Sequence, residues 1–171
     1  MIRAFTMEDM PTVLKIWLTA SIDAHHFIAA KFWQEQLNDM RLFYIPAAEN
    51  YLYQHGTQVL GFYSLYENKL AALFVKPEMQ GLGIGGNLLE HARQQREQLT
   101  LNVYCDNQAS VNFYRHKGAV IIGEQICPHT GHKEYKMQLT GLKGLSAHTK
   151  KSFSLAIAKG RQSSEDKEHK Q

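Results

Sequence analysis

The chain has 171 residues, 44% of them hydrophobic, so it can bury one core and is expected to form one domain. Its formal net charge of +3 does not favour a nucleic-acid partner, because residues 1–140 carry 12 basic and 13 acidic side chains (net −1) while residues 141–171 carry 7 and 3 (net +4). No signal pattern opens the chain and no apolar stretch approaches about 18 residues, so we expect a soluble cytoplasmic protein without a membrane partner.

The first part of the chain predicts a short strand followed by two helices. Residues 2–4 are the strand candidate, and Thr6 with Asp9 has the spacing of a helix N-cap. Helices are predicted over about residues 7–20 and 27–44, because apolar residues recur there every three or four positions. The joint between them contains His25 and His26, and Pro46 is expected to close the helical part.

From residue 50 onward the pattern predicts mainly strands. Residues 51–53 and 59–66 form a predicted hairpin, and 70–75 is an apolar strand expected to be covered on both faces. Further predicted elements are a helix from 84, a strand over 99–105, a helix over 107–117 and strands over 120–126 and 134–139. Cys105 lies on the apolar side of its strand, and two cysteines are too few for a disulfide scaffold, so a reduced core residue is expected. The predicted order is β-α-α-β-β-β-α-β-α-β-β, an α/β layered fold.

Residues 141–171 are rich in Lys, Ser and Gly, which predicts a basic and mobile tail. Lys150, Lys151 and Arg161 could dock the protein on nucleic acid, a ribosome or an acidic protein. A solvated tail is the simpler interpretation, because only Phe153 offers an aromatic ring for base stacking.

A glycine-dense run between the apolar strand and the next helix is the most informative motif. It reads Gly81, Leu82, Gly83, Ile84, Gly85 and Gly86. Such a run lets several backbone N–H groups face one ligand, and the following helix adds its positive end. These features predict a phosphate or pyrophosphate cradle. Nicotinamide dehydrogenases and coenzyme A acyltransferases both use such a cradle.

The dehydrogenase hypothesis has support, since Gly81, Gly83 and Gly86 satisfy G-x-G-x-x-G and Asp106 follows Gly86 by 20 residues. Three observations count against it. Residues 76–80 separate the strand from the glycines, the motif lies in mid-chain with too little sequence after it, and the preceding strands are hairpin-linked. The acyltransferase hypothesis is therefore favoured.

Residues 80–85, which read Gln-Gly-Leu-Gly-Ile-Gly, match the Q/R-x-x-G-x-G/A motif of the GNAT superfamily of N-acetyltransferases. Downstream, the chain resembles that family's second coenzyme A signature at Asn107, Ala109, Phe113, Tyr114 and Gly118. The resemblance covers residues 1–140 and is strongest to small bacterial acetyltransferases with a histidine and an apolar pair in the first joint, here His26-Phe27-Ile28. Ala119 departs from the usual Phe. The resemblance implies a GNAT fold with a central mixed, mostly antiparallel sheet.

The resemblance also implies roles for individual residues, with acetyl-CoA as cosubstrate and no metal. Backbone N–H groups of residues 81–86 would bind the pyrophosphate. A strand splayed from its neighbour would pair with the pantetheine arm through Leu73, Phe74 and Val75. Asn107 would contact the arm, and Tyr114 would act as general acid toward the sulfur. For Tyr114 the competing interpretation is an ordinary aromatic residue between helix and core.

The general base and the acceptor are less defined. Glu67, acting through water, is one candidate base, although a solvated glutamate at a hairpin turn is the competing interpretation. His26 is the other, and His25, His26 and Phe27 are expected to line the acceptor pocket. The expected acceptor is a primary amine of a small metabolite or a protein lysine. A catalytically degenerate coenzyme A-binding domain, acting as a sensor or structural module, is the alternative function, and a monomer and a homodimer are both compatible with the sequence.

Overall fold

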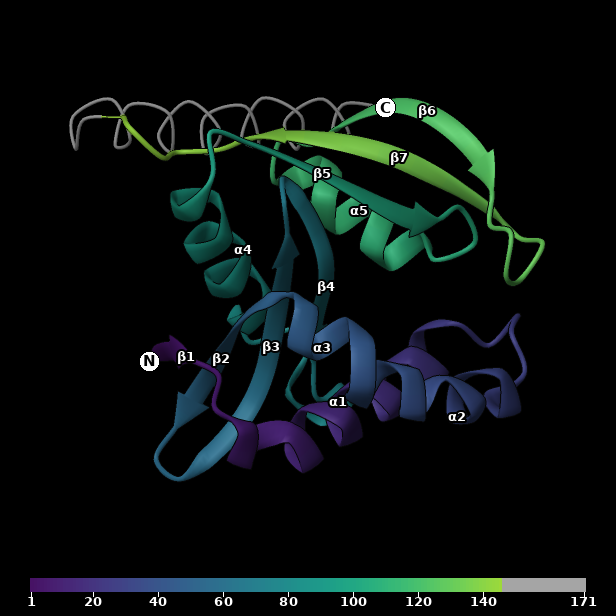
Figure 1. Cartoon of the computed structure of the whole chain (residues 1–171). Helices are drawn as coiled ribbons and strands as arrows, with labels where there is room; N and C mark the ends of the chain where they lie inside the picture. The colour runs from purple at the N-terminus through teal and green to yellow at the C-terminus, as the bar shows by residue number, and fades with distance from the viewer. Residues whose placement is uncertain (146–171) are drawn as a thin grey trace.

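A computed structural model of the chain describes residues 1–145. Within these residues, one seven-stranded sheet has the order β1-β2-β3-β4-β5-β7-β6, and only β4 and β5 are parallel neighbours (Figure 1). The expected α/β class with a mixed, mostly antiparallel sheet is confirmed. The strands are β1 (Ile2–Ala4), β2 (Glu49–His55), β3 (Gln58–Tyr66), β4 (Lys69–Val75), β5 (Gln98–Tyr104), β6 (Val120–Ile126) and β7 (Lys133–Thr140).

The helices are α1 (Met10–Ala24), α2 (Ala30–Asp39), α3 (Ile45–Ala47), α4 (Ile84–Gln95) and α5 (Gln108–His116), with single 3-10 turns at Met7–Asp9 and Pro77–Met79. The predicted Thr6 cap is present, but it begins the 3-10 turn Met7–Asp9 that leads into α1: Asp9 Oδ2 accepts hydrogen bonds from the backbone N–H and the hydroxyl of Thr6 at 2.8 and 3.1 Å. None of the helices in residues 1–145 is long and apolar enough to cross a bilayer.

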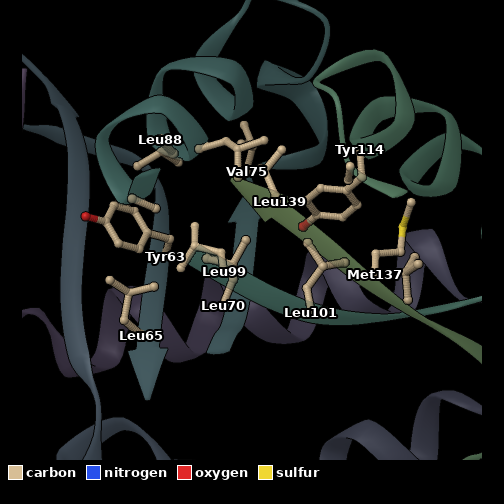
Figure 2. Close-up of a cluster of buried hydrophobic side chains, with 14 of the residues drawn as sticks. Tyr63, Leu65, Leu70, Val75, Leu88, Leu99, Leu101, Tyr114, Met137 and Leu139 are labelled. Atoms are coloured by element: carbon tan, nitrogen blue, oxygen red, sulfur yellow. The ribbon is translucent and has the colours of Figure 1, made fainter. Parts of the chain in front are cut away.

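Helices cover the sheet from two sides and divide the core into two clusters. One cluster joins Leu88 and Leu89 of α4 and Tyr114 of α5 to the central strands (Figure 2). The other joins Trp17 of α1 and Trp33 of α2 to β2 and β3. The predicted apolar stripe of α4 is therefore buried as expected. Burial of the apolar faces of the helices against the sheet is the main favourable contribution to the free energy of folding.

The second predicted helix differs from the structure. The joint lies later than predicted, at residues 25–29, α2 covers only Ala30–Asp39, and a π-helical turn at Met40–Tyr44 leads into α3. The helical part does not stop before Pro46, because helical structure continues through Ala47. Pro46 lies inside α3, which continues directly from the π-helical turn, and the chain becomes extended two residues later, at Ala48.

Strand β4 is not covered on both faces, so that expectation is wrong. Leu70 and Val75 are buried, but Ala71 is exposed and Phe74 is only partly buried. The reason is that β4 and β5 share a single register pair, Lys69↔Thr100, and then diverge (Figure 1). The splayed strand that the family resemblance implied is present.

Cys105 is not the core residue that the alternation predicted. The strand ends at Tyr104, and Cys105 lies partly exposed in the turn before α5, with its N–H bonded to Lys133 O at 3.0 Å. Both cysteines are free thiols, and Cys127 is the buried one.

The tail expected to be mobile lies outside the described residues apart from its first five. Of these five, Leu142 packs against the end of α4, where it is 1% exposed and its N–H donates to Arg93 O at 2.7 Å. The domain boundary at residue 140 stays a prediction.

Gly61 of β3 is expected to be a packing constraint. An added Cβ would lie 2.8 Å from Phe74 O and 3.1 Å from Leu88 Cδ1, so Gly61→Ala should lower the free energy of unfolding by about 1–3 kcal/mol in urea denaturation. Gly123→Ala in β6 is the matched control, since nothing lies within 4 Å of its added Cβ. Equal stability of the two variants would contradict this packing account.

Candidate active site

A cleft of about 2120 Å³ opens where β4 and β5 diverge. Its walls come from the joint between α1 and α2, from β4, from the glycine run, from the start of α5 and from the β6–β7 hairpin. Pockets for single small ligands usually measure roughly 300–1,000 Å³. The cleft is therefore large enough for an extended ligand together with a second reactant.

The glycine run forms a turn that leads directly into α4. Gly81 and Gly83 have φ values of +80° and +83°, a region that side chains disfavour, and Gly83 is the N-cap of α4. Nothing lies within 4 Å of a Cβ added at either position. The Gln80 side chain fastens the turn to the strand by donating to Val75 O at 3.1 Å. The turn is thus held open beside the helix N-terminus.

This turn has the donors that an anionic ligand needs. The first N–H groups of a helix have no carbonyl partner one turn back, and they carry the positive end of the helix dipole. Lys117 adds a cation, with its Nζ 3.0 Å from the Cβ position of Gly86. Gly81, Gly83, Ile84, Gly85 and Gly86 line the cleft, whereas the Leu82 side chain does not and is 67% exposed. Leu82 can therefore contribute only its backbone.

Leu73, Phe74 and Val75 also line the cleft, as the sequence predicted. Beyond Lys69, the backbone edge of β4 that faces β5 has no strand partner within residues 1–145. Such an edge can exchange hydrogen bonds with an extended ligand that contains amides. The position suits a chain running from the glycine turn toward the middle of the sheet.

Tyr114 reaches the cleft from α5. Its ring is 8% exposed and packs among Leu101, Met137 and Leu139 (Figure 2). The hydroxyl forms no hydrogen bond within residues 1–145. Burial raises the pKa of Tyr114 above its usual value, so the phenol keeps its proton at neutral pH. Tyr114 can therefore donate that proton to a group in the cleft.

Asn107 and His25 hold each other in place at the other side of the cleft. Asn107 Oδ1 caps α5 by accepting the Ser110 N–H at 3.2 Å, and its Nδ2 lies 3.4 Å from His25 Nε2. His25 Nδ1 lies 2.8 Å from Ser21 O and must donate to it. Nε2 is then the acceptor for Asn107, which identifies a neutral imidazole. Burial also lowers the pKa of His25.

The two adjacent histidines have different environments. His25 is buried, stacked on Trp33 with ring centroids 5.0 Å apart, whereas His26 is exposed at the rim. Both line the cleft. Phe27 does not; it packs edge-on against Tyr104 and His132, with ring centroids 5.7 and 5.1 Å away. The structure thus brings His25, rather than His26, next to Asn107.

Glu67 is not brought to the cleft. It lies exposed in the β3–β4 turn with φ +52°, and its backbone carbonyl accepts a hydrogen bond from Arg96 Nε at 2.7 Å. Glu67 is not among the residues that line the cleft. This placement agrees with the competing interpretation of a solvated turn glutamate.

The sequence did not single out several residues of the β6–β7 side. Tyr104 donates to Cys127 Sγ at 3.4 Å, and both line the cleft together with Glu134. Burial acts to raise the pKa of Cys127, but hydrogen bonds from Thr130, Tyr104 and nearby backbone N–H groups outweigh it and lower that pKa. The register that pairs Tyr104 with Glu134 is the one signal that could have identified Tyr104, Cys127 and Glu134 as neighbours. Among the residues described, no three His, Cys, Asp or Glu side chains are arranged to hold a metal ion.

The pKa of His25 predicts a pH effect on stability. Because folding lowers this pKa, the unfolded chain binds more protons once the pH falls below about 6.5, and stability decreases as pH falls through that window. In urea unfolding at pH 7.5 and pH 5.5, His25→Gln should lose less stability on acidification than the wild type. The exposed His26→Gln is the matched control, and identical losses in wild type and His25→Gln would contradict the assignment.

Comparison with known proteins gives a consistent result. The sequence model of the acetyltransferase (GNAT) domain matches residues 19–140. Peptidyl-lysine N-acetyltransferase YiaC of Escherichia coli is 35% identical over 123 residues, 71% of this chain and 84% of that protein. Peptidyl-lysine N-acetyltransferase YjaB of the same organism is 30% identical over 123 residues, 71% of this chain and 83% of that protein.

Solved structures of other proteins also resemble this one, among them the two that follow. The solution structure of apo-form YjaB from E. coli aligns with a TM-score of 0.73 at 27% identity, covering 82% of this chain and 97% of that one. The PaiA N-acetyltransferase of Thermoplasma acidophilum, solved in complex with coenzyme A, aligns with a TM-score of 0.67 at 17% identity, covering 82% and 98%, and shows a shared fold. With the family match covering most of the sheet and helices described above, the chain belongs to the GNAT family of acetyltransferases and is an N-acetyltransferase.

Proposed function

We propose that the protein uses acetyl-CoA to acetylate the side-chain amine of a protein lysine. The observation that carries the proposal is the single cleft that joins the glycine turn, the open edge of β4 and the protonated Tyr114. The acceptor class is supported by the two E. coli relatives, both named peptidyl-lysine N-acetyltransferases. The cleft is also open to the surface at His26, where a peptide can approach.

The residues of the cleft fit each part of the cosubstrate. The N–H groups at the start of α4, with Lys117 beside Gly86, suit the pyrophosphate. The unpaired edge of β4 at Leu73, Phe74 and Val75 suits the amides of the pantetheine arm. When bound, acetyl-CoA supplies the acetyl group as a thioester. Asn107 reaches the cleft with its amide already fixed by His25 and the start of α5.

Tyr114 acts as the general acid in this proposal. Its phenol is neutral, buried and without a hydrogen-bond partner within residues 1–145, so its proton is available to a leaving sulfur. Apolar residues pack around the ring, and the residue also lines the cleft. His25 is less suited as the general base, because its Nε2 lone pair already faces Asn107.

Replacing Tyr114 by Phe should lower kcat by about 100-fold, because general-acid catalysis typically contributes that much or more. The KM for acetyl-CoA should change less than about threefold, since the ring still fills the core. Tyr53→Phe, outside the cleft, is the control and should keep wild-type kinetics. The measurement is steady-state kinetics with a lysine peptide. An unaltered Tm for both variants would show that they remain folded. An undiminished kcat would exclude Tyr114 as the acid.

Replacing Gly83 by Ala should weaken coenzyme A binding by about tenfold, because a side chain strains the left-handed N-cap and shifts the N–H groups of α4. Isothermal titration calorimetry measures the dissociation constant. Gly56→Ala in the β2–β3 hairpin is the matched control, with φ +57° and no atom within 4 Å of the added Cβ. Coenzyme A affinity equal to that of the control would argue against the cradle.

A direct test of the function measures thiol release from acetyl-CoA with a panel of amines. Lysine-containing peptides should support release that depends on both substrates, and mass spectrometry should show the acetyl group on the lysine Nζ. Release with small polyamines alone would overturn the acceptor class. Coenzyme A binding without thiol release from any amine would overturn the enzymatic proposal.

A further inference from the structure

One buried carboxylate in the cleft has no role in the mechanism above. Glu134 of β7 is 9% exposed and lines the cleft. The other carboxylates that line it differ: Asp23 and Asp106 are exposed, and Glu90 is partly exposed with its Oε2 3.4 Å from Arg93 Nη1. Within residues 1–145, Glu134 is therefore the one buried acid that the cleft presents.

Strand register places Glu134 on the face opposite Tyr114. Leu101↔Met137 and Leu99↔Leu139 of β5 and β7 point toward α4, α5 and the Tyr114 ring. The alternate pair, Tyr104↔Glu134, points to the other face, where Tyr104 meets His25 with ring centroids 5.2 Å apart. The proton donor and the buried carboxylate thus approach the cleft from the two faces of the same strands.

The hydrogen bonds of Glu134 are incomplete. Gln125 Nε2 donates to its Oε1 at 2.6 Å, while Oε2 accepts no hydrogen bond within residues 1–145. No basic side chain in that range forms an ion pair with it, and the adjacent Lys133 is paired with Glu124 at 3.3 Å. Oε2 is not among the fully buried side-chain atoms of residues 1–145, so this oxygen is accessible from the cleft. A carboxylate oxygen in that position can bind a cationic group of a ligand.

The surroundings define the shape of that ligand. Tyr104 is the register partner of Glu134, its ring meets His25, and His25 stacks on Trp33, so these three rings form one aromatic wall of the cleft. Aromatic faces accommodate an alkyl chain and favour a cationic end group. An alkylammonium, apolar along its stem and charged at its tip, matches the wall and the carboxylate together.

We propose that Glu134 is a specificity-determining residue that binds the ammonium group of the acceptor lysine as it enters the cleft. Gln125 holds the carboxylate in position, and Tyr104 with Trp33 contacts the alkyl stem. The inference rests on the proposed function, since it assigns the acceptor-binding group of the same site. It predicts that the enzyme discriminates against uncharged side chains at the binding step.

The test compares Glu134→Gln, which removes the charge, with Glu124→Gln, a control on the neighbouring strand whose carboxylate is exposed. For a short lysine peptide, Glu134→Gln should raise KM by about tenfold or more while kcat and the KM for acetyl-CoA change less than about threefold. Glu134→Asp, which keeps the charge, should recover part of the loss. A fall in kcat with an unchanged KM would overturn the proposal.

Calorimetry supplies a readout that does not depend on turnover. With coenzyme A present, wild-type protein should bind the lysine peptide about tenfold or more tightly than the same peptide with norleucine, and Glu134→Gln should lose that preference. Equal affinity of the wild type for the two peptides overturns the proposal even if Glu134→Gln does not fold. If lysine is preferred but never acetylated, the proposed function fails while the role of Glu134 stands.

Discussion

The divergence of β4 from β5 is the constraint on which the rest of the structure depends. The two strands share the pair Lys69↔Thr100 and then separate, although they are neighbours in the middle of the sheet. The separation leaves one backbone edge of β4 without a strand partner within residues 1–145 and exposes side chains that an ordinary central strand would bury. The N–H and C=O groups of that edge line the cleft, where solvent or an extended ligand with amide groups can hydrogen-bond to them.

The two faces of β5 and β7 carry different residues of the candidate site. One face of β5 and β7 packs on α4 and α5, and there Tyr114 is kept neutral by burial. The other face carries Tyr104 and Glu134 toward the joint between α1 and α2. In the proposed function, the acetyl donor and the amine acceptor would therefore meet in the opening from opposite sides, with the glycine turn at the start of α4 as the proposed binding site of the donor.

The parts of the site that are local in sequence could be predicted, whereas those that depend on register could not. The glycine turn and the cap of α5 at Asn107 are set by residues a few positions apart, and both were identified. The opening of β4 could not be derived from its apolar pattern, which matches a fully covered strand equally well. The sequence did not indicate a site role for Glu134, which is evident only from its register pairing with Tyr104. Likewise, the sequence could not tell which of the two adjacent histidines is buried, because the packing of the joint buries His25 and leaves His26 exposed.

Amide hydrogen exchange with and without coenzyme A tests the central claim most directly, because it reports on the backbone groups of the opening themselves. If the cleft between β4 and β5 holds the cosubstrate, coenzyme A should slow exchange at residues 73–75 and 81–86 while leaving the β2–β3 hairpin unchanged. Protection confined to other segments, or uniform protection across the chain, would contradict the account.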